Sequence, residues 1–567
     1  MASIQARRRG RRTYYYLVES RRVAGKPRPV VLKYLGTADS LKARLEEAEA
    51  AGKPLRADVV RFGAVAALWD LAQRLDLPGT IDGEVGVRSS RPSVGTYLTL
   101  AAVNRCLATT SKARFGAWYR RTVLPRLCGV PAKLLNSQRF WDAMEVVSAD
   151  TIHAVENKLS ARLVREFDLD LRTLCFDCTN FDTFFDSSNP AALAQRGHAK
   201  SKRTDLRVVG LALMVTLDGE IPLFSEVYAG NQPDSVTFES VTEDLVARYR
   251  LIAKEAEHVT LVFDKGNNSK ENLRTVVDSP YHVVGSLVPS QHPDLLAVPL
   301  KDYTAMNDPR LQGVVAFRTK KVVWGREWTL VLTRSETLLA GQLRGIAQHL
   351  AKRRAKLRTL QAKLRRSQEP GNKGKGYTRE SLEKHARELS SGQYLKEILE
   401  VRVSTRGKRL SLSFHTNAQA LEQLVRNVLG KRILFTDNDA WSTEEIVLGY
   451  RSQHHVEAAF RQMKDRRFTS FTPIRHWTDQ KIRVHAFCCV LALTLAHVLR
   501  REVGRMGIVL STDALLDELE SIEEVVNLYP ARGSEGGRPQ ARRVLTRRTR
   551  LQEQLFRLLG LARFEKG

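Results

Sequence analysis

The sequence predicts an α/β fold with a mixed β-sheet, helices on both faces, an interrupting insertion and flanking helical regions. Three observations carry this expectation. Short strand-like runs bounded by turn residues fill positions 171–290. Strand-like sequence returns at Lys431–Thr436 after a stretch of different character, and helical periodicity dominates from Val60 to Phe167. A chain of 567 residues is long enough for several domains with ample core.

The N-terminal part predicts a β-hairpin followed by helices. Thr13–Ser20 and Pro27–Leu35 are expected as strands, with a helix after Ser40. Residues 1–60 form this first region, with possible DNA contact, and 61–168 a helical DNA-binding region. Within it, Lys112–Arg121 mixes Lys and Arg with aromatic residues, which suits contact with a DNA backbone. Trp118 and Tyr119 can equally belong to a core.

The central part predicts strands in a distinctive order. A strand carrying Asp177 is followed by a hairpin, Val208–Thr216 and Ile221–Tyr228, turning at Asp218-Gly219. A helix from about Asp234 is expected next, then a strand ending at Asp264, another helix, and a strand at Tyr281–Val288. Three strands in meander order, a helix, a strand and a helix form the opening of an RNase H-like fold. Residues 169–300 and 431–505 are its expected two parts.

Residues 301–430 are expected as the insertion, a β-hairpin plus a basic helix. The hairpin is Val314–Thr333, turning at Gly325. Leu343, Ile346, Leu350, Leu357, Leu360 and Leu364 occupy heptad positions. This helix can pair with another helix, lie along DNA or pack on its own domain. Residues 506–567 are expected as basic helices containing Arg542, Arg543, Arg547, Arg548 and Arg550.

The amino-acid composition indicates which class of binding partner the chain has. The 91 Lys and Arg against 62 Asp and Glu give a net charge of +29, which favours a polyanion through counterion release. A ribosomal or membrane-surface protein can be equally basic, so charge alone names no reaction. Six cysteines make no disulfide framework in a chain this long. Cys175 and Cys178 fall on opposite faces of a strand, which disfavours a zinc site.

Membrane insertion and secretion are not expected. The apolar run Ala486–Leu499 is too short to span a bilayer, and the basic N-terminus has no apolar segment behind it. The expected location is therefore the cytoplasm.

Three acidic residues stand out by their contexts. Asp177 and Asp264 end apolar strand-like runs, and Glu457 lies in a probable helix that begins after the capping box Ser442–Glu445. At 100° per residue, one stripe of that helix presents Tyr450, Gln453, Glu457 and Lys464. Taken alone, each acid can be catalytic or can be an ordinary turn, capping or solvated residue. Together, two carboxylates at strand ends and one on a helix can share a pair of divalent cations, which cleaves and joins phosphodiesters.

These segments resemble the DDE insertion-sequence transposases, in the branch with a Y-x2-R-x3-E-x6-K signature. Tyr450, Glu457 and Lys464 match three of its positions at the right spacing. Gln453 occupies the arginine position, where Arg451 or Arg461 can supply the charge. Further similar segments are Asp177-x-Thr179, Gly230-Asn231-x-x-Asp234, Asp264-Lys265-Gly266 and His476-Trp477 with Ile482-x-x-His485.

The resemblance implies a catalytic domain of RNase H-like fold and a reaction on double-stranded DNA. Asp177, Asp264 and Glu457 would be catalytic and would bind Mg2+, with Mn2+ as a substitute. Water would cut a strand at the transposon end, and the 3′-OH would then attack target DNA. Pairing two ends implies a homodimer on DNA, and the resemblance implies a prokaryotic cytoplasm, in association with the nucleoid. The DNA-binding residues expected are Tyr450, Gln453, Arg461, Lys464, Trp324 and Trp328.

Trp324 and Trp328 flank the Gly325 turn of the insertion. The resemblance implies that an aromatic side chain from this insertion holds a flipped base. Packing of both tryptophans inside the insertion is the alternative.

Two other classes of function stay open. One is a metal-dependent nuclease of RNase H-like fold, which would not need large basic flanking regions. The other is a non-catalytic DNA-binding protein derived from a transposase, which would tolerate loss of the acidic residues.

Overall fold

The structure is a computed structural model of the chain. It describes residues 2–10, 12–23, 26–43, 54–86, 91–186, 188–197, 199–232, 247–248, 259–263, 281–370, 376–407, 409–530 and 540–565. Asp234, Asp264 and the helices expected near them lie outside this part. The chain divides into two compact units. One comprises Met1–Asp82, Val87–Val146 and Leu495–Gly567, and the other Gly83–Gly86 and Val147–Thr494.

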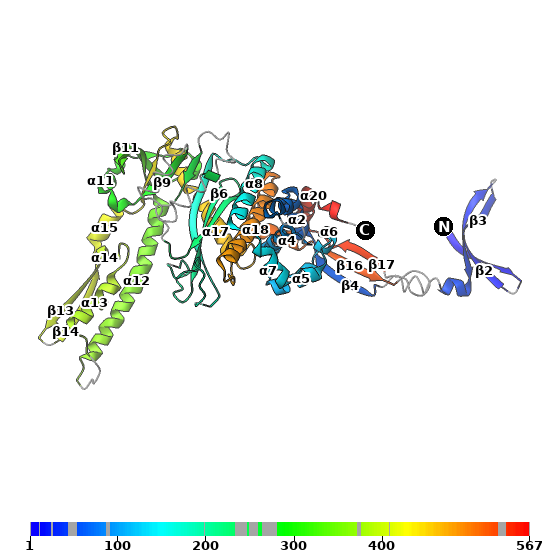
Figure 1. Cartoon of the computed structure of the whole chain (residues 1–567), viewed down its shortest axis with the longest axis horizontal. Helices are drawn as coiled ribbons and strands as arrows, with labels where there is room; N and C mark the ends of the chain where they lie inside the picture. Colours follow the sequence, from blue (N-terminus) through cyan, green and yellow to red (C-terminus); the bar gives the residue numbers. More distant parts are fainter. Residues whose placement is uncertain are drawn as a thin grey trace. The chain divides into compact units, whose positions relative to one another are not determined.

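The second unit is built on a mixed sheet, whose described strands have the order β10-β11-β12-β15-β9-β8-β5-β6-β7 (Figure 1). The strands are β5 (Thr173–Asp182), β6 (Val208–Thr216), β7 (Pro222–Ala229), β8 (Thr260–Val262), β9 (His282–Leu287), β10 (Thr304–Ala305), β11 (Val314–Val323), β12 (Arg326–Ser335) and β15 (Lys431–Thr436). Strand β8 is parallel to β5 and to β9, and the other pairs are antiparallel. The predicted meander β5-β6-β7 and the insertion hairpin β11-β12 are confirmed.

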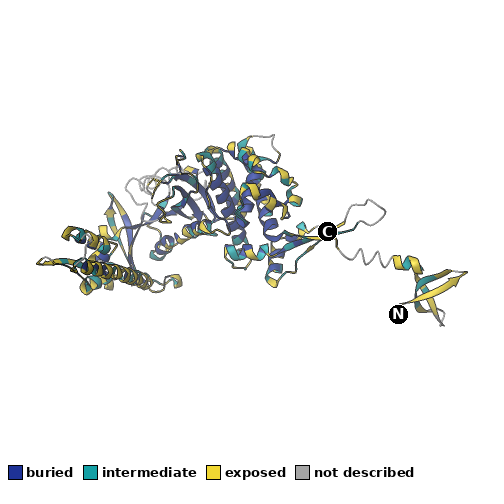
Figure 2. Cartoon of the chain, turned by 90° about the horizontal axis from the view of Figure 1, so that it is seen from below, coloured by how far each residue is buried: buried dark blue, intermediate teal, exposed yellow. Residues whose placement is uncertain are grey.

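One face of this sheet packs against three helices. Cys175, Leu213 and Val262 share a core cluster with residues of α16 (Thr443–Arg451), α17 (His454–Lys464) and α18 (Asp479–Arg505). Helix α8 (Ala149–Phe167) packs against β7, where Ser160 Oγ donates a hydrogen bond to Leu223 O at 2.6 Å. The strands of the sheet and the helices beside it are mostly buried (Figure 2).

Helix α18 is long and apolar enough to raise the question of a membrane span. Its most apolar 18-residue window is 94% buried inside the protein. Such burial is that of a core helix, as the sequence predicts for Ala486–Leu499.

The insertion has its own small cores. Besides the hairpin β11-β12 it contains α12 (Glu336–Ser367), α13 (Arg379–Ser390), α14 (Leu395–Ile398), β13 (Leu399–Arg406), β14 (Arg409–Thr416) and α15 (Ala418–Asn427), and it is preceded by α11 (Pro293–Leu296). Leu357, Leu360 and Leu364 of α12 pack with Leu382 and Leu412, and Ile346 packs in a second cluster. The heptad leucines therefore pack on their own domain, which was one of the three alternatives.

The first unit contains two three-stranded sheets and a set of helices. The N-terminal sheet is β1 (Ala2–Arg9), β2 (Arg12–Val23) and β3 (Lys26–Thr37). The predicted helical region comprises α2 (Gly63–Arg74), α3 (Leu77–Val85), α4 (Val94–Leu107), α5 (Lys112–Arg120), α6 (Leu124–Cys128) and α7 (Ser137–Glu145). Trp118 and Tyr119 are 7% and 0% exposed, and Tyr119 Oη donates to Val130 O at 2.8 Å. Both are core residues.

The expectation of basic helices throughout 506–567 is wrong. Helices α19 (Thr512–Glu520) and α20 (Arg550–Leu558) are present, but Glu523–Tyr529 and Gln540–Leu545 form strands β16 and β17. Strand β16 also pairs with β4 (Arg56–Arg61), so the sheet joins segments far apart in the sequence. Such long-range pairing overrides local propensity, and it places Arg542 and Arg543 on a strand.

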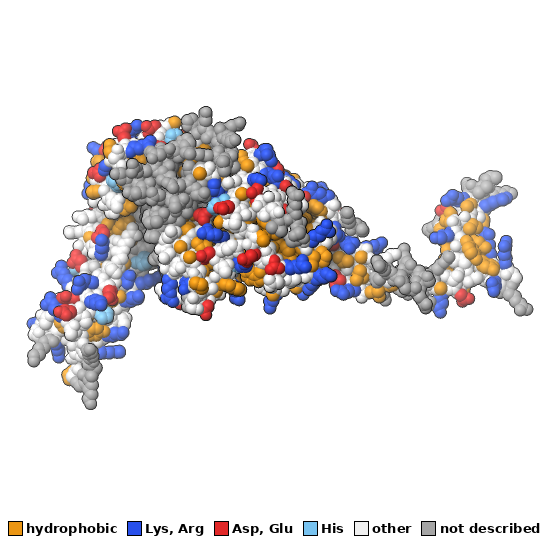
Figure 3. Space-filling view, in the orientation of Figure 1, with side chains coloured by type: hydrophobic (Ala, Val, Ile, Leu, Met, Phe, Trp, Pro, Cys, Tyr) orange, Lys and Arg blue, Asp and Glu red, His pale blue; other side chains and the backbone are white. Residues whose placement is uncertain are grey.

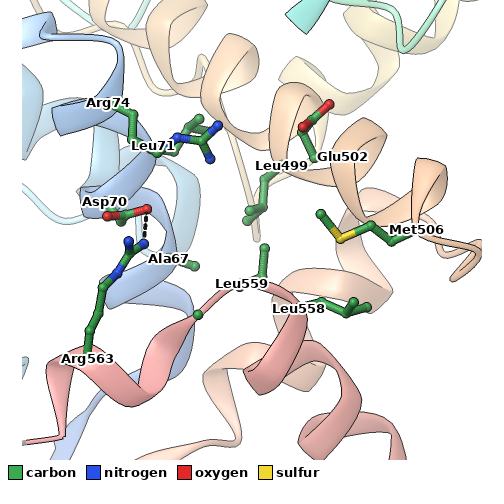
Figure 4. Close-up of a pocket in the computed structure, with 11 residues that line it drawn as sticks. Ala67, Asp70, Leu71, Arg74, Leu499, Glu502, Met506, Leu558, Leu559 and Arg563 are labelled. Atoms are coloured by element: carbon green, nitrogen blue, oxygen red, sulfur yellow. Dashed lines mark ion pairs between the residues drawn. The ribbon is translucent and has the colours of Figure 1, made fainter. Parts of the chain in front are cut away.

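The first unit also contains a cavity of about 290 Å³ (Figure 4). Apolar side chains such as Leu71 and Leu499 line it, and Arg563 bridges to Asp70 at 2.6 Å. None of its lining residues belongs to the unit that carries Asp177 and Glu457.

Candidate active site on strand β5

Asp177 lies on a strand that is otherwise almost fully buried. Its neighbours Phe176 and Cys178 are 3% and 1% exposed, whereas Asp177 is half-buried. In the register of the sheet, Asp177 pairs with Leu213 of β6, and Cys175 pairs with Val262 of β8. Since side chains alternate along a strand, Cys175, Asp177 and Thr179 share one face.

Two contacts hold the segment Ser452–Lys464, which contains the Glu457 helix, against that face. Cys175 Sγ donates to Ser452 O at 3.2 Å, and Lys464 Nζ donates to Thr179 Oγ1 at 2.8 Å. Cys175 and Thr179 lie two residues on either side of Asp177, so the segment from Ser452 to Lys464 spans its position. Glu457 is in the first turn of α17 and is exposed. The structure therefore brings the Glu457 helix onto the face of β5 that carries Asp177.

The expected continuous helix from Tyr450 to Lys464 is wrong. Helix α16 ends at Arg451 and α17 begins at His454. The hydroxyl of Ser452 donates to Gly449 O, and His455 N donates to Ser452 O at 2.9 Å, one residue closer than in an α-helix. Serine hydroxyls compete in this way with backbone hydrogen bonds and favour a local turn.

The break changes the exposure of the predicted stripe. Tyr450 is 7% exposed and Gln453 8% exposed, so both are buried. The Arg432 guanidinium lies 5.6 Å from the centre of the Tyr450 ring. Glu457, Arg461 and Lys464 are exposed, and Val456, Ala459, Phe460 and Met463 are buried as predicted.

Lys464 combines an exposed side chain with a buried amino end. Its ammonium lies 5.5 Å from the centre of the Phe181 ring and binds the buried Thr179. Desolvation lowers the pKa of Lys464, and repulsion from Lys200 lowers it further, while Asp177 and Asp182 oppose the shift. The amino group is therefore within electrostatic reach of the Asp177 carboxylate.

Lys200 is a residue of this site that the sequence did not reveal. Its Nζ donates to Cys178 O at 2.7 Å, and its N–H donates to Asn180 Oδ1 at 3.0 Å. It comes from an irregular segment between β5 and β6, which has no periodicity to indicate its position. Thr179 was recognisable by its two-residue spacing from Asp177.

Cysteine ligation does not account for the site. Burial raises the pKa of Cys175 to about 12, with the Ser452 hydrogen bond acting against the shift, and the thiol already donates to Ser452 O. Cys178 is on the opposite face of β5. Within the described ranges no group of three His, Cys, Asp or Glu residues is suited to a metal ion, and Asp264 lies outside them.

A further acidic residue lies near Cys175. Glu220, in the turn between β6 and β7, raises the pKa of Cys175, and His455 Nδ1 lies 3.1 Å from Glu220 Oε1. His455 stacks on His454 with ring centres 4.0 Å apart. The contact between His455 and Glu220 holds the start of α17 against the turn between β6 and β7.

The two tryptophans of the insertion differ in their surroundings. Trp328 is 2% exposed, donates from Nε1 to Val323 O at 3.2 Å, and packs edge-on against Phe435. Trp328 is therefore a packed side chain, which was the alternative to a role in holding a flipped base. Trp324 is half-buried, also contacts Phe435 edge-on, and has a left-handed φ of 53°.

Comparison with known proteins adds one family match. Residues 2–58 match the N-terminal domain of the IS1634 family transposases. No curated protein sequence matches the chain. The cryo-EM structure of a piggyBac transposase synaptic complex with hairpin DNA is similar, with 10% identity, 82% of each chain covered and a TM-score of 0.34. The family match supports a DNA transposase of an insertion sequence.

Proposed function

We propose that this chain is a DDE transposase that cuts the ends of an insertion sequence and joins them to target DNA. The observation that carries the proposal is the docking of the Glu457 helix on the Asp177 face of β5. The segment Ser452–Lys464 forms hydrogen bonds with Cys175 and with Thr179, which lie on either side of Asp177 along β5. An acidic strand residue and an acidic helix residue then belong to one site.

The sheet order supports an RNase H-like catalytic domain. Strands β9-β8-β5-β6-β7 place β5 in the middle, with a meander on one side and parallel strands on the other. Val262 pairs with Cys175, and Asp264 follows Val262 by two residues just as Asp177 follows Cys175. Asp264 lies outside the described residues, and its role in this site is proposed from the sequence resemblance.

The donor set suits a hard divalent cation. Asp177 and Glu457 offer carboxylate oxygens, the thiol of Cys175 is protonated, and oxygen donors favour Mg2+ or Mn2+. When bound by Asp177, Asp264 and Glu457, the ions would activate the attacking oxygen and stabilise the leaving one. Lys464 holds a positive charge at the same face through its bond to Thr179. Arg461 and Lys464, both exposed on α17, contact the DNA phosphates.

The roles of the other signature residues follow from their burial. Tyr450 lies in the core below Arg432 and Gln453 is buried at the helix break. Both position α17 rather than reach DNA directly. The proposed partners remain the two transposon ends and target DNA, held by a homodimer.

The test needs the transposon ends, which are to be sought as inverted repeats in the DNA that flanks the gene. Wild-type protein with Mg2+ should cut these ends and join a pre-cut end to a supercoiled plasmid. Asp177→Asn and Glu457→Gln should bind the ends with wild-type affinity and lose both reactions, as expected for a lost metal ligand. Glu444→Gln, which removes one acid from the neighbouring helix α16, is the matched control and should stay active.

The outcomes separate the three classes of function. Strand-transfer products support the transposase, and cleavage without joining supports a metal-dependent nuclease. A mobility shift without either reaction supports a DNA-binding protein derived from a transposase. Wild-type activity in Asp177→Asn or Glu457→Gln contradicts the proposed site.

A further inference from the structure

The N-terminal sheet gathers aromatic rings on one face. In the register of the sheet, Tyr16 pairs with Gln5 of β1 and with Tyr34 of β3, and Tyr14 pairs with Arg7. The ring centres of Tyr16 and Tyr34 are 5.2 Å apart, and those of Tyr14 and Tyr34 are 6.2 Å apart. The Arg7 guanidinium lies 5.1 Å from the centre of the Tyr16 ring. Three tyrosines and an arginine therefore form one contiguous cluster, here called the tyrosine face.

The tyrosine face is open to solvent. Tyr34 is 51% exposed and Val31 of the same strand 41%, whereas Val18 is 4% exposed. Tyr14 and Tyr16 are half-buried and supply packing between the strands. A purely structural cluster would hide the ring of Tyr34 as well, since an exposed aromatic surface has a cost in water. The exposure of Tyr34 indicates a surface for a partner.

Positive charge surrounds the tyrosine face. The exposed cationic side chains of the described sheet are Arg7, Arg8, Arg9, Arg12, Arg21, Arg28 and Lys33. Glu19 is the acidic residue within the strands, and Arg21 bridges to it at 2.8 Å. Figure 3 shows apolar and aromatic side chains of this sheet with Lys and Arg around them. Such a surface complements a polyanion that also has flat, uncharged faces.

We infer that the tyrosine face binds unpaired bases of single-stranded DNA. Exposed aromatic rings stack on bases regardless of sequence, and arginines beside them contact the phosphates. A duplex offers the same phosphates, but its bases are stacked on one another and unavailable to Tyr34. By pairing and alternation, Arg7, Arg9 and Arg12 share the tyrosine face, so both chemistries are on one surface.

This inference goes beyond the proposed function and shares no residue with the Asp177 site. It holds whether or not the chain cuts DNA. Within a transposase, it assigns to the N-terminal sheet the single-stranded DNA exposed next to a cut or melted end.

The experiment uses the full-length protein without divalent ions, so that binding is measured apart from cleavage. Fluorescein-labelled oligonucleotides of one mixed sequence are titrated as a single strand and as a blunt duplex at the same salt concentration. Tyr34→Ala should weaken single-strand binding by about fivefold or more, the fold-change that corresponds to stacking one base. Duplex binding should change by less than about twofold. Tyr34→Phe keeps the ring and should bind the single strand like the wild type.

A charge-matched pair tests the face itself. Lys33 pairs with Leu17 and lies next to Tyr34, hence on the opposite face of the sheet. Arg7→Gln should reduce single-strand binding more than Lys33→Gln, although each removes one positive charge. Circular dichroism and limited proteolysis establish that each variant is folded.

Three results overturn the inference. The first is unchanged single-strand binding in folded Tyr34→Ala. The second is an equal loss for single strand and duplex, which shows phosphate contact alone. The third is binding of an RNA of the same sequence with no measurable binding of the DNA strand.

Discussion

At the residue scale, the position of Asp177 is set by its neighbours on the strand. Cys175 and Thr179 each hold one end of the segment Ser452–Lys464, so Asp177 cannot shift without moving those contacts. The amino group of Lys464 reaches the site by donating a hydrogen bond to the buried hydroxyl of Thr179. Desolvation of the amino group lowers the pKa of Lys464.

The lowered pKa of Lys464 predicts how DNA binding depends on pH. Lysine ordinarily titrates at 10.5, and here desolvation makes the ammonium lose its proton at a lower pH. The advantage of wild type over Lys464→Gln in end binding should therefore be full near neutral pH and shrink as pH rises towards 10.5. Lys464→Arg keeps its charge at every pH used and should not show this decline.

Titrations of fluorescent end DNA between pH 7 and 10 measure this ratio. Asp177→Asn offers a second readout, because Asp177 acts to raise the pKa of Lys464. Removing that carboxylate should move the decline to lower pH. A constant ratio of wild type to Lys464→Gln over the whole range contradicts a charged role for Lys464.

At the element scale, the turn of the β11-β12 hairpin is strained. Trp324 and Gly325 have φ values of 53° and 85°, a turn that favours Asn-Gly in that order. Bulky residues with a left-handed backbone conformation cluster at functional sites, where the surrounding structure holds them in place. Trp324→Asn should therefore keep the free energy of unfolding within about 1 kcal/mol, because relief of strain offsets the lost contact with Phe435. We expect cleavage of transposon ends to fall in this folded variant.

Trp328→Ala is the contrasting change in the same hairpin. Trp328 is 2% exposed, so truncation leaves a cavity and should cost about 3–5 kcal/mol. Denaturant unfolding of both variants separates the two roles. Wild-type cleavage in folded Trp324→Asn would show that the tryptophan is dispensable for the reaction.

Helix α8, strand β7 and helix α18 meet at a second titratable group. His153 Nε2 lies 2.8 Å from Glu226 Oε2, and Arg483 donates to Glu226 Oε1 at 2.9 Å. The hydrogen bond to Glu226 raises the pKa of His153 from 6.5, against the effect of burial. A raised pKa in the folded state stabilises the protein below the unfolded pKa, and the stabilisation is lost as pH rises through the folded value.

His153→Gln should therefore destabilise the protein most at acid pH, by up to about 1 kcal/mol for a partly exposed pair. The difference from wild type should narrow at alkaline pH. Urea unfolding at a series of pH values measures it. A difference that grows with pH would mean that the neutral histidine, not the charged one, makes the favourable contact.

The elements that the sequence predicted well are those with local signals. Strands β6 and β15 have the predicted bounds, because apolar runs between turn residues determine them. The capping box at Ser442–Glu445 is present as predicted. The break between α16 and α17 was missed, because it depends on Cys175 contacting Ser452 from a strand 277 residues away. Strands β16 and β17 were missed because β16 pairs with β4, which is remote in the sequence, and β17 pairs in turn with β16.

At the scale of the whole molecule, charge is the property that any DNA-binding role must use. The chain carries a net charge of +29, and its exposed Lys and Arg are spread over both units. In the insertion, Lys352, Arg354, Lys356 and Arg358 of α12 are exposed while its leucines are buried. These exposed cations can therefore displace the counterions that surround DNA phosphates.

DNA binding by the intact chain should consequently fall steeply with salt. Counterion release makes the logarithm of the binding constant decrease linearly with the logarithm of salt concentration, by about 0.9 for each phosphate neutralised. A protein that contacts 6–10 phosphates loses roughly 10³- to 10⁵-fold in affinity between 50 and 200 mM salt. We expect a loss in this range for duplex DNA, measured by fluorescence anisotropy without divalent ions. Replacing Lys352, Arg354, Lys356 and Arg358 by Gln should lower the slope if α12 lies along DNA and leave it unchanged if α12 only packs on its domain. An equal affinity for duplex DNA at the two salt concentrations would contradict phosphate contact by the cationic surfaces. It would also contradict the interpretation that the positive charge serves DNA binding.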